Sequence, residues 1–230
     1  RAMQISVDTT INGRAEESAS DFYQVDLEAG DTIRIRCHSE ALVSRLSASL
    51  TIFGPDGTEL DRDRDNSDRD AMVACTASSS GSYFIQVSDF TFRGGPAYTY
   101  RLEVAKGPQI LFAYPPAGEV GKTTTHLLYG RNLPDSDPSR RIHLGGRLLD
   151  VVEAQISIDS LETFESNTRI RQSMIPTKSY RLMDGTTSSN AIPLGIATAP
   201  MILETETGPD GDAQSVQIPC EIQGRFDRTR

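Results

Sequence analysis

The fold class is indicated by one stretch, residues 22–37, which reads FYQVDLEAGDTIRIRC. Side chains alternate between two faces over its first six residues. They alternate again from Thr32, which places Ile33, Ile35 and Cys37 on one face. Alternation with a period of two is the mark of a half-buried strand, and the Gly-containing segment between the runs is a turn. The stretch therefore predicts two strands joined by a turn.

Strands and turns continue outward from this stretch as far as Val104. Residues 54–57 read GPDG, a turn in which Pro presets φ and Gly accepts a positive φ. We expect further strands at residues 50–53, 72–75, 82–87 and 98–104. Turn signals recur about every ten residues, a spacing that indicates a sandwich or barrel.

A boundary falls at residues 106–108, Lys-Gly-Pro, and a second strand-rich region follows it. Its expected strands are 110–113, 123–129, 142–144, 148–156, 179–182 and 191–196. Residues 159–171 lack alternation and fit either a loop or one short helix capped by Asp159 or Ser160. Residues 204–212 are acidic and contain Gly and Pro, as in a linker. After them, residues 222–225 (IQGR) repeat the pattern of residues 11–14 (INGR).

We therefore predict an all-β chain with two antiparallel β-sandwich domains, residues 1–106 and 107–203. Residues 204–230 are expected to be an acidic linker and the first strand of a truncated second copy of the first domain. The opening RAMQ contains no signal peptide, and we expect the chain to be a piece of a longer protein.

Composition excludes several classes of function. The 230 residues carry a net charge of −9 and show no basic patch, which argues against nucleic-acid binding. No apolar run is long enough to span a bilayer. The three cysteines fit no metal spacing; Cys37 and Cys75 are either buried thiols or one disulfide, and Cys220 is expected to be unpaired.

Residues 8–104 resemble the bacterial pre-peptidase C-terminal (PPC) domain, a jelly-roll-like β-sandwich. The motifs that carry this resemblance are INGR (11–14), DFYQV (21–25), AGD (29–31), LTIFGPDG (50–57) and GSYFIQV (81–87). The ending FRGGP (92–96), with Tyr98 and residues 100–102 (YRL), is similar to the planctomycete-type version of the domain.

Residues 107–200 resemble an Ig-like IPT/TIG domain, through Pro108, Gly121 and the motifs YPPAG (114–118), LYGRNL (128–133) and SNAIPL (189–194). Arrays of such domains imply a large exported bacterial protein, located in the periplasm, at the cell surface or outside the cell. Its PPC domains flank or follow the working part. Relatives of this type bind calcium, and some bind collagen or other polymers.

No catalytic motif is complete, so we expect no enzyme in this chain. Gly121-Lys122-Thr123 resembles the end of a phosphate-binding loop, but Pro116 stands where that loop needs Gly, and strand-like sequence follows. The three histidines lack zinc spacing, and no nucleophile elbow is present. We expect His126 and His143 to face solvent or a neighbouring strand.

Calcium is the one cofactor that the sequence suggests, because several carboxylates lie close together in two places. The first candidate set is Asp61, Asp63, Asp65 and Asp68, followed by Asp70. Interleaved arginines also fit a solvated charged loop with local ion pairs. The second set is Glu204, Glu206, Asp210 and Asp212, with Asp227, which also fits a mobile charged connector. The resemblance implies no complete family-type calcium site in the first domain, where only Asp21 of the expected acidic element is present.

A cluster of aromatic residues, Phe90, Phe92, Tyr98 and Tyr100, is a candidate carbohydrate-stacking face, although it also fits a hairpin packed on its own Gly94-Gly95 turn. The favoured function is a non-catalytic binding or adhesion module that presents loops to a protein or polysaccharide at the cell surface. The alternatives are a structural spacer between other domains of the same polypeptide and a calcium-dependent rigid linker.

Overall fold

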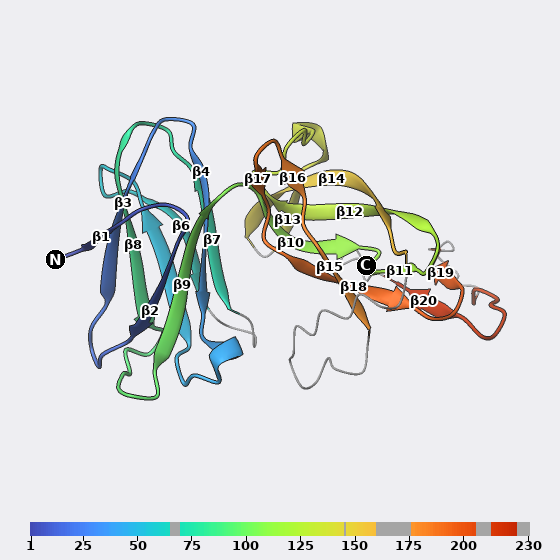
Figure 1. The fold of residues 1–230 in the computed structure, drawn as a ribbon, viewed down its shortest axis with the longest axis horizontal. Helices are drawn as coiled ribbons and strands as arrows, with labels where there is room; N and C mark the ends of the chain where they lie inside the picture. Colours follow the sequence, from blue (N-terminus) through green and yellow to red (C-terminus); the bar gives the residue numbers. More distant parts are fainter. Residues whose placement is uncertain (65–69, 145, 160–175, 206–212, 225–230) are drawn as a thin grey trace. The chain divides into compact units, whose positions relative to one another are not determined.

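The structure is a computed structural model that describes residues 1–64, 70–144, 146–159, 176–205 and 213–224. These ranges consist of strands and connecting turns, with two short 3₁₀ helices, η1 (Glu40–Leu42) and η2 (Pro138–Arg140). The all-β prediction is confirmed (Figure 1). Among the described residues, no helix has the length and hydropathy needed to cross a membrane. The chain divides into two compact units. The first comprises Arg1–Gln109 and Met183–Ser189, and the second Ile110–Leu182 and Asn190–Arg230.

The first unit is a sandwich of two sheets. One sheet has the strand order β1 (Met3–Ile5), β3 (Asp21–Leu27), β8 (Gly81–Asp89), β5 (Ala48–Phe53) and β6 (Glu59–Arg64). We call it the groove sheet. The other, the cluster sheet, has the order β2 (Thr9–Arg14), β9 (Thr99–Lys106), β4 (Thr32–His38) and β7 (Ala71–Thr76). All pairs are antiparallel except β1 with β3.

Alternation along each strand builds the core between these sheets. Ile33, Ile35 and Cys37 of β4 are fully buried, as the sequence predicts, while Arg34, Arg36 and His38 lie on the opposite face of the strand. Tyr83, Ile85 and Val87 of β8 supply the facing layer. Burial of such side chains is the main favourable term in folding.

Cys37 and Cys75, both in the described part of the chain, are thiols rather than a disulfide. The register of β4 with β7 gives the reason. Cys75 lies opposite Ile33, whereas Cys37 lies opposite Ala71, near the other end of the strand pair. The two Cα atoms are therefore too far apart for a disulfide.

A hairpin of very short strands, β16 (Met183–Asp184) and β17 (Thr187–Ser188), groups with the first unit. Arg34 of β4 donates a hydrogen bond from Nη1 to the carbonyl oxygen of Ser188 at 2.8 Å. The sequence did not predict this hairpin, because two-residue strands carry no periodic signal.

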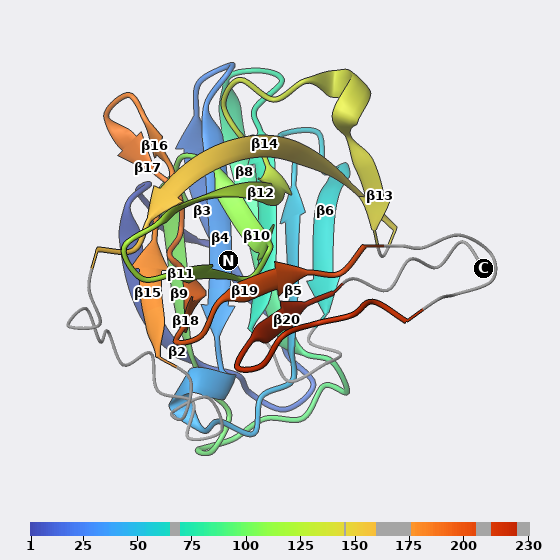
Figure 2. The same ribbon diagram turned by 90° about the vertical axis from the view of Figure 1, so that its right-hand side faces the viewer.

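The second unit also consists of facing sheets. One contains β10 (Gln109–Tyr114), β12 (Thr123–Arg131), β14 (Arg147–Ser157) and β13 (Ile142–Leu144). Another contains β11 (Ala117–Glu119), β18 (Ile192–Ala197) and β15 (Thr177–Tyr180). Figure 2 shows β14 as a long curved strand. A buried cluster includes Leu128 and Ile156 from the first of these sheets and Ile192 and Leu194 from the second.

Asn190 ties β10 to the segment that leads into β18. Its Oδ1 accepts from the Ile110 amide and its Nδ2 donates to the Ile110 carbonyl, both at 2.8 Å. The Asn190 side-chain amide thus pairs with the main chain of Ile110 as a neighbouring strand would, and it satisfies two buried main-chain groups.

The carboxyl end departs in part from expectation. β19 (Met201–Leu203) and β20 (Glu221–Gln223) form a parallel pair, and β11 with β18 is also parallel. Residues 213–220 contain no strand. The possible helix at residues 159–171 lies, beyond Asp159, outside the described residues.

Candidate functional site

The first candidate calcium set begins within a strand and not, as predicted, in a loop. Asp61 and Asp63 lie in β6, and their side chains face the edge of β7. Asp63 Oδ2 accepts from the Met72 amide at 2.9 Å, and Asp61 Oδ2 accepts from the Ala74 amide at 3.1 Å. These carboxylates accept hydrogen bonds from amides of β7 that do not pair with β4. Because β6 and β7 belong to different sheets, the bonds join the two sheets of the sandwich at this edge.

The reading of residues 61–64 as part of a charged loop is therefore wrong, because alternating Asp and Arg form a period-two strand with no apolar residue to mark it. Asp65 and Asp68, and in the second set Glu206, Asp210, Asp212 and Asp227, lie outside the described residues. Glu204 is exposed, and its amide donates to the Gln223 carbonyl at 2.8 Å. Across the described ranges, no three His, Cys, Asp or Glu side chains converge as metal ligands.

The aromatic set divides in two. Tyr100 is only 1% exposed, so its assignment to a binding face is wrong. Its hydroxyl donates to Asp21 Oδ2 at 2.5 Å and lies 2.6 Å from the Tyr23 hydroxyl. Burial and then the Asp21 carboxylate raise the pKa of Tyr100 far above its ordinary value. A Cβ on Gly13 would lie 2.3 Å from this ring, which explains the Gly of the INGR motif.

Phe90 and Phe92, in contrast, are 44% and 55% exposed. They project from the loop that follows β8, and Asp89 organises that loop. Its buried carboxylate accepts from the amides of Ser47, Thr91 and Arg93 at 3.0–3.1 Å and from the Thr91 hydroxyl at 2.7 Å. Burial alone would raise the pKa of Asp89, but these hydrogen bonds outweigh it and lower the pKa. Asp89 thus holds the main chain of the loop from which both rings project.

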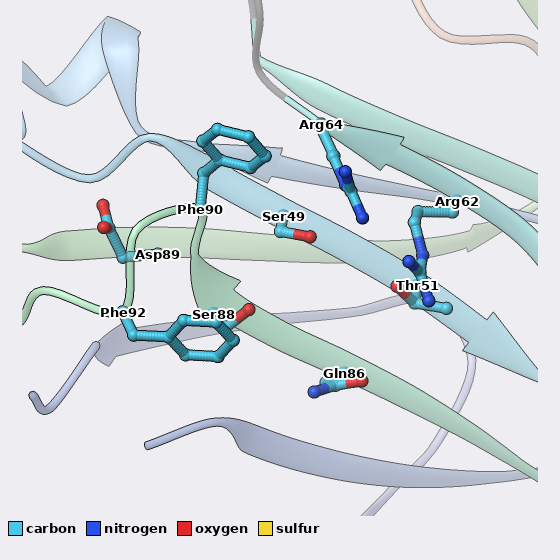
Figure 3. Close-up of a pocket in the computed structure, with 9 residues that line it drawn as sticks. All are labelled: Ser49, Thr51, Arg62, Arg64, Gln86, Ser88, Asp89, Phe90 and Phe92. Carbon is cyan, nitrogen blue, oxygen red and sulfur yellow. The ribbon is translucent and has the colours of Figure 1, made fainter. Parts of the chain in front are cut away.

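The two rings border a groove on the outer face of the groove sheet. Besides Phe90 and Phe92, its lining consists of Ser49, Thr51, Arg62, Arg64, Gln86, Ser88 and Asp89. Figure 3 shows the rings on one side and the two arginines on the other, with serine hydroxyls between them. The Arg64 guanidinium lies 5.4 Å from the centre of the Phe90 ring, a cation–π contact. Tyr98 is half-buried against the core and is not part of this lining.

Strand register sets the floor of the groove. Arg62, Thr51 and Gln86 form one cross-strand row, and Arg64, Ser49 and Ser88 form the next. Both rows carry a cation and groups that donate and accept hydrogen bonds. The arrangement can bind a ligand that has both apolar and polar surfaces, but it contains no nucleophile paired with a base.

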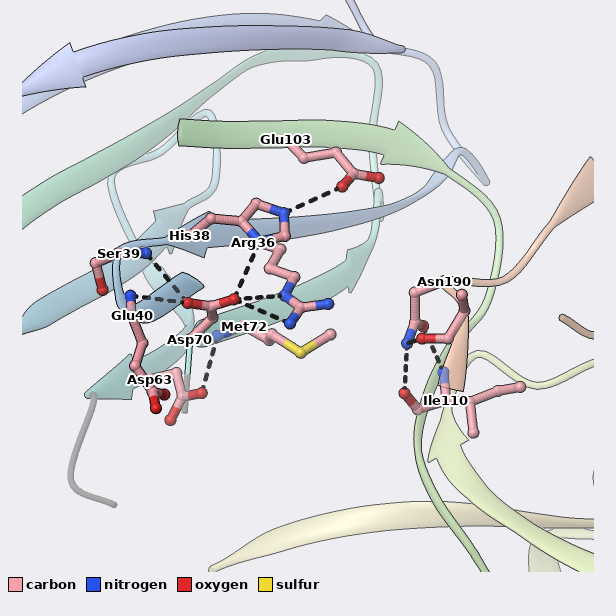
Figure 4. Close-up of polar contacts among 11 residues, drawn as sticks. Arg36, His38, Ser39, Glu40, Asp63, Asp70, Met72, Glu103, Ile110 and Asn190 are labelled. Atoms are coloured by element: carbon pink, nitrogen blue, oxygen red, sulfur yellow. Dashed lines mark hydrogen bonds and ion pairs between the residues drawn. The ribbon is translucent and has the colours of Figure 1, made fainter. Parts of the chain in front are cut away.

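A second polar feature lies on the outer face of the cluster sheet. Asp70, whose side chain is 1% exposed, accepts from Arg36 Nη2 at 2.9 Å and from the amides of Ser39 and Glu40 at 3.1 and 3.2 Å (Figure 4). Its Oδ2 also lies 3.0 Å from His38 Nδ1. Burial favours the neutral acid, but the His38 hydrogen bond, the Arg36 charge and the Ser39 amide hold the pKa of Asp70 far below its ordinary value.

His38 is held between two carboxylates, since its Nε2 lies 3.4 Å from Glu103 Oε2. Hydrogen bonds with Asp70 and then Glu103 raise the pKa of His38, although burial and Arg36 oppose them. Both ring nitrogens are engaged, so His38 cannot act as base for a serine. We call these four residues, Arg36, His38, Asp70 and Glu103, the charge cluster.

His126 does not face solvent, the first of the two predicted alternatives, but lies fully buried in the second unit. Its ring lies beside the neighbouring strand β11, where a Cβ on Gly118 would be 3.6 Å from Nε2. Its Nδ1 lies 2.7 Å from the Pro115 carbonyl oxygen. Burial lowers the pKa of His126, and the Pro115 contact opposes this only in part. The histidine is a neutral interior residue.

Sequence reasoning missed Arg62, Arg64 and Asp89 as parts of the groove. Two signals point to them. The Asp/Arg alternation of residues 61–64 has the period of a strand, and an Asp two residues before a Thr, as at 89–91, favours a local side-chain turn.

No curated protein sequence matches the chain. The pre-peptidase C-terminal domain of Bacillus anthracis collagenase is 20% identical over 45% of this chain and 94% of its own, with a TM-score of 0.38. The Aeromonas hydrophila protein PliG, a periplasmic inhibitor of g-type lysozyme, is 17% identical over 46% and 98%, with a TM-score of 0.36.

A surface-associated copper-binding protein of Methylomicrobium album BG8, CorA, is 14% identical over 45% and 98%, with a TM-score of 0.33. Residues 19–89 match the family described as bacterial pre-peptidase C-terminal domain. The chain therefore contains, at residues 19–89, a bacterial pre-peptidase C-terminal domain.

Proposed function

We propose that the first unit is a non-catalytic binding module of an exported bacterial protein, with its ligand surface in the groove of the groove sheet. The observation that carries this proposal is the pair of exposed rings, Phe90 and Phe92, which the buried carboxylate of Asp89 holds in place. Exposed aromatic side chains beside a polar floor are typical of ligand sites.

The family match supports the two coarser parts of this proposal. PPC domains are accessory domains, and the resemblance to them implies export. The Ig-like IPT/TIG assignment of residues 107–203, the truncated PPC copy after residue 204 and calcium binding by the acidic linker are further proposals. Asp61 and Asp63 support calcium less than their sequence suggests, because their carboxylates accept main-chain hydrogen bonds from β7.

Arrays of glycans and matrix proteins test the binding function. We expect the chain to bind at least one polymer class, and Phe90→Ala/Phe92→Ala to lose about tenfold or more in affinity, since aromatic anchors dominate such sites. Phe112→Ala is the matched control, because Phe112 is 37% exposed but lies in β10 of the second unit. Equal loss in both variants would contradict the placement of the site.

A structural spacer is the second candidate function. It is favoured by the short connection at the domain boundary, because β9 ends at Lys106 and β10 begins at Gln109. Only Gly107 and Pro108 separate the two strands, and short linkers limit independent domain motion. A chain that binds no polymer on any array would support this function over the first.

A further inference from the structure

The accessible charge of the groove is positive, although the whole chain carries −9. The lining contains two arginines and one carboxylate. That carboxylate, Asp89, has a side-chain exposure of 0% and is bonded within its own loop. Glu59 pairs with Arg62 from outside the lining, whereas Arg64 lies against the Phe90 ring. An anionic group in the groove would therefore meet at least one guanidinium.

The main chain in the middle of the floor has no capacity to pair with an added strand. β5 lies between β6 and β8, and β8 lies between β3 and β5, so their amides and carbonyls are engaged in sheet ladders. A peptide that binds by strand addition needs an open edge, which only β6, the floor strand at the edge of this sheet, could offer. Recognition over β5 and β8 must come from side chains: rings, hydroxyls, an amide and guanidinium groups.

Resting on the proposed function, we propose that this groove binds an acidic polysaccharide, a chain of sugar rings that bear carboxylate or sulfate groups. Phe90 and Phe92 would contact the apolar faces of the rings. Ser49 and Gln86 would bond ring hydroxyls, since Thr51 and Ser88 are buried in the floor. Arg62 and Arg64 would bind the acid groups, for which the guanidinium fork is well shaped.

The size of the groove fits a short segment of such a polymer. Its volume is 310 Å³, and small-molecule sites span about 300–1,000 Å³. The floor strands β6, β5 and β8 span about 10 Å at the usual strand spacing. A single-stranded nucleic acid fits less well, because its binding depends on a basic groove that tracks many phosphates, and the whole chain carries a net charge of −9.

The test measures binding of the full chain to polygalacturonate and to its methyl ester, which keeps the rings and removes the charge. We expect binding to the acid polymer to exceed binding to the ester by about tenfold and to weaken as salt is raised. Arg62→Gln/Arg64→Gln should remove that preference. Arg45→Gln/Arg101→Gln is the charge-matched control, because both arginines are exposed and outside the groove lining. Dextran sulfate against dextran extends the test to sulfate groups.

The outcomes separate this inference from the proposed function. Equal binding to acid and neutral polymers, still lost in Phe90→Ala/Phe92→Ala, would overturn the inference and leave the binding function in place. Binding to poly-glutamate or single-stranded DNA in preference to every polysaccharide would also overturn it. Binding to nothing, by a chain that circular dichroism shows to be folded, would overturn both. If Arg45→Gln/Arg101→Gln also lost the preference for acid polymers, that preference would come from the overall charge of the chain and not from the groove, and the inference would be overturned.

Discussion

The two outer faces of the first unit use their charged residues in opposite ways. On the cluster sheet, Asp70 and Glu103 bind Arg36 and His38, and the carboxylate of Asp70 is almost fully buried. On the groove sheet, Arg62 pairs with the partly exposed Glu59, and Arg64 lies against the exposed Phe90 ring. The first arrangement is built around a buried carboxylate, whereas the second holds its arginines at the surface.

This difference separates two roles that the sequence alone does not distinguish. A charge that is buried and fully paired contributes to the fold, and removal of one partner leaves the others buried without compensation. A charge on an exposed face contributes little to stability and can serve recognition. The comparison therefore predicts large stability effects on one face and small ones on the other.

The largest effect is expected at Asp70. Asp70→Ala removes the partner of Arg36 and His38 and the acceptor of two backbone amides. We expect the free energy of unfolding of the first unit to fall by about 3–5 kcal/mol. Urea unfolding followed by circular dichroism measures this, and hydrogen exchange of β4 and β7 assigns it to the first unit.

The control for this prediction is Asp26→Ala. Asp26 is exposed on the groove sheet, where it accepts side-chain hydrogen bonds from Gln4 and Ser82, so its loss should change stability by about 0.5 kcal/mol or less. Similar effects at Asp70 and Asp26 would break the distinction between the two faces.

A smaller effect is expected within β6, whose alternate residues serve both roles. Asp63→Ala removes the acceptor of the Met72 amide, and an unsatisfied buried group costs about 1–3 kcal/mol. Arg64→Gln, one residue on, faces the groove and should cost about 0.5 kcal/mol or less. Asp63→Asn keeps an acceptor oxygen and should recover most of the loss in the same urea titration. No recovery would show that the charge of Asp63, rather than its hydrogen bond, matters.

Sequence predicted the sandwich well because its core strands alternate. The faces of β3 and β4 follow directly from residues 22–37. The same rule places Tyr100 inside, since it shares the face of Leu102 and Val104, which are fully buried. Grouping Tyr100 with Phe90 by closeness in sequence was the error, because a turn separates the exposed loop from strand β9.

The groove was only half predictable. Phe90 and Phe92 stand out as aromatic residues beside a glycine turn. Arg62 and Arg64 join them only through the pairing of β6 with β5, and such long-range pairing leaves no mark in an all-charged strand. The charge cluster is equally hidden, because Asp70 and Glu103 are 33 residues apart in sequence and meet His38 across two strand pairs.

The smallest effect concerns His38 and tests whether the charge cluster is a stabilising unit. The folded state raises the pKa of His38 above the ordinary 6.5. Its contribution is therefore fully present below about pH 6.5 and is lost as the pH rises through the raised value. We expect the urea midpoint of the first unit to fall as the pH rises above about 6.5. His38→Gln should flatten that slope and cost about 1 kcal/mol at pH 6.

Asp70, Glu103 and His126 do not produce the same fall of the urea midpoint with rising pH. The pKa values of Asp70 and Glu103 are lowered, so both carboxylates stay ionised in this pH range. His126 has a lowered pKa, so its effect has the opposite sign: it destabilises the second unit as the pH falls below about 6.5. If the urea midpoint of His38→Gln changed with pH as much as that of the parent chain, the pH dependence would arise outside the charge cluster. That result would contradict the prediction that ion pairs of His38 stabilise the cluster sheet.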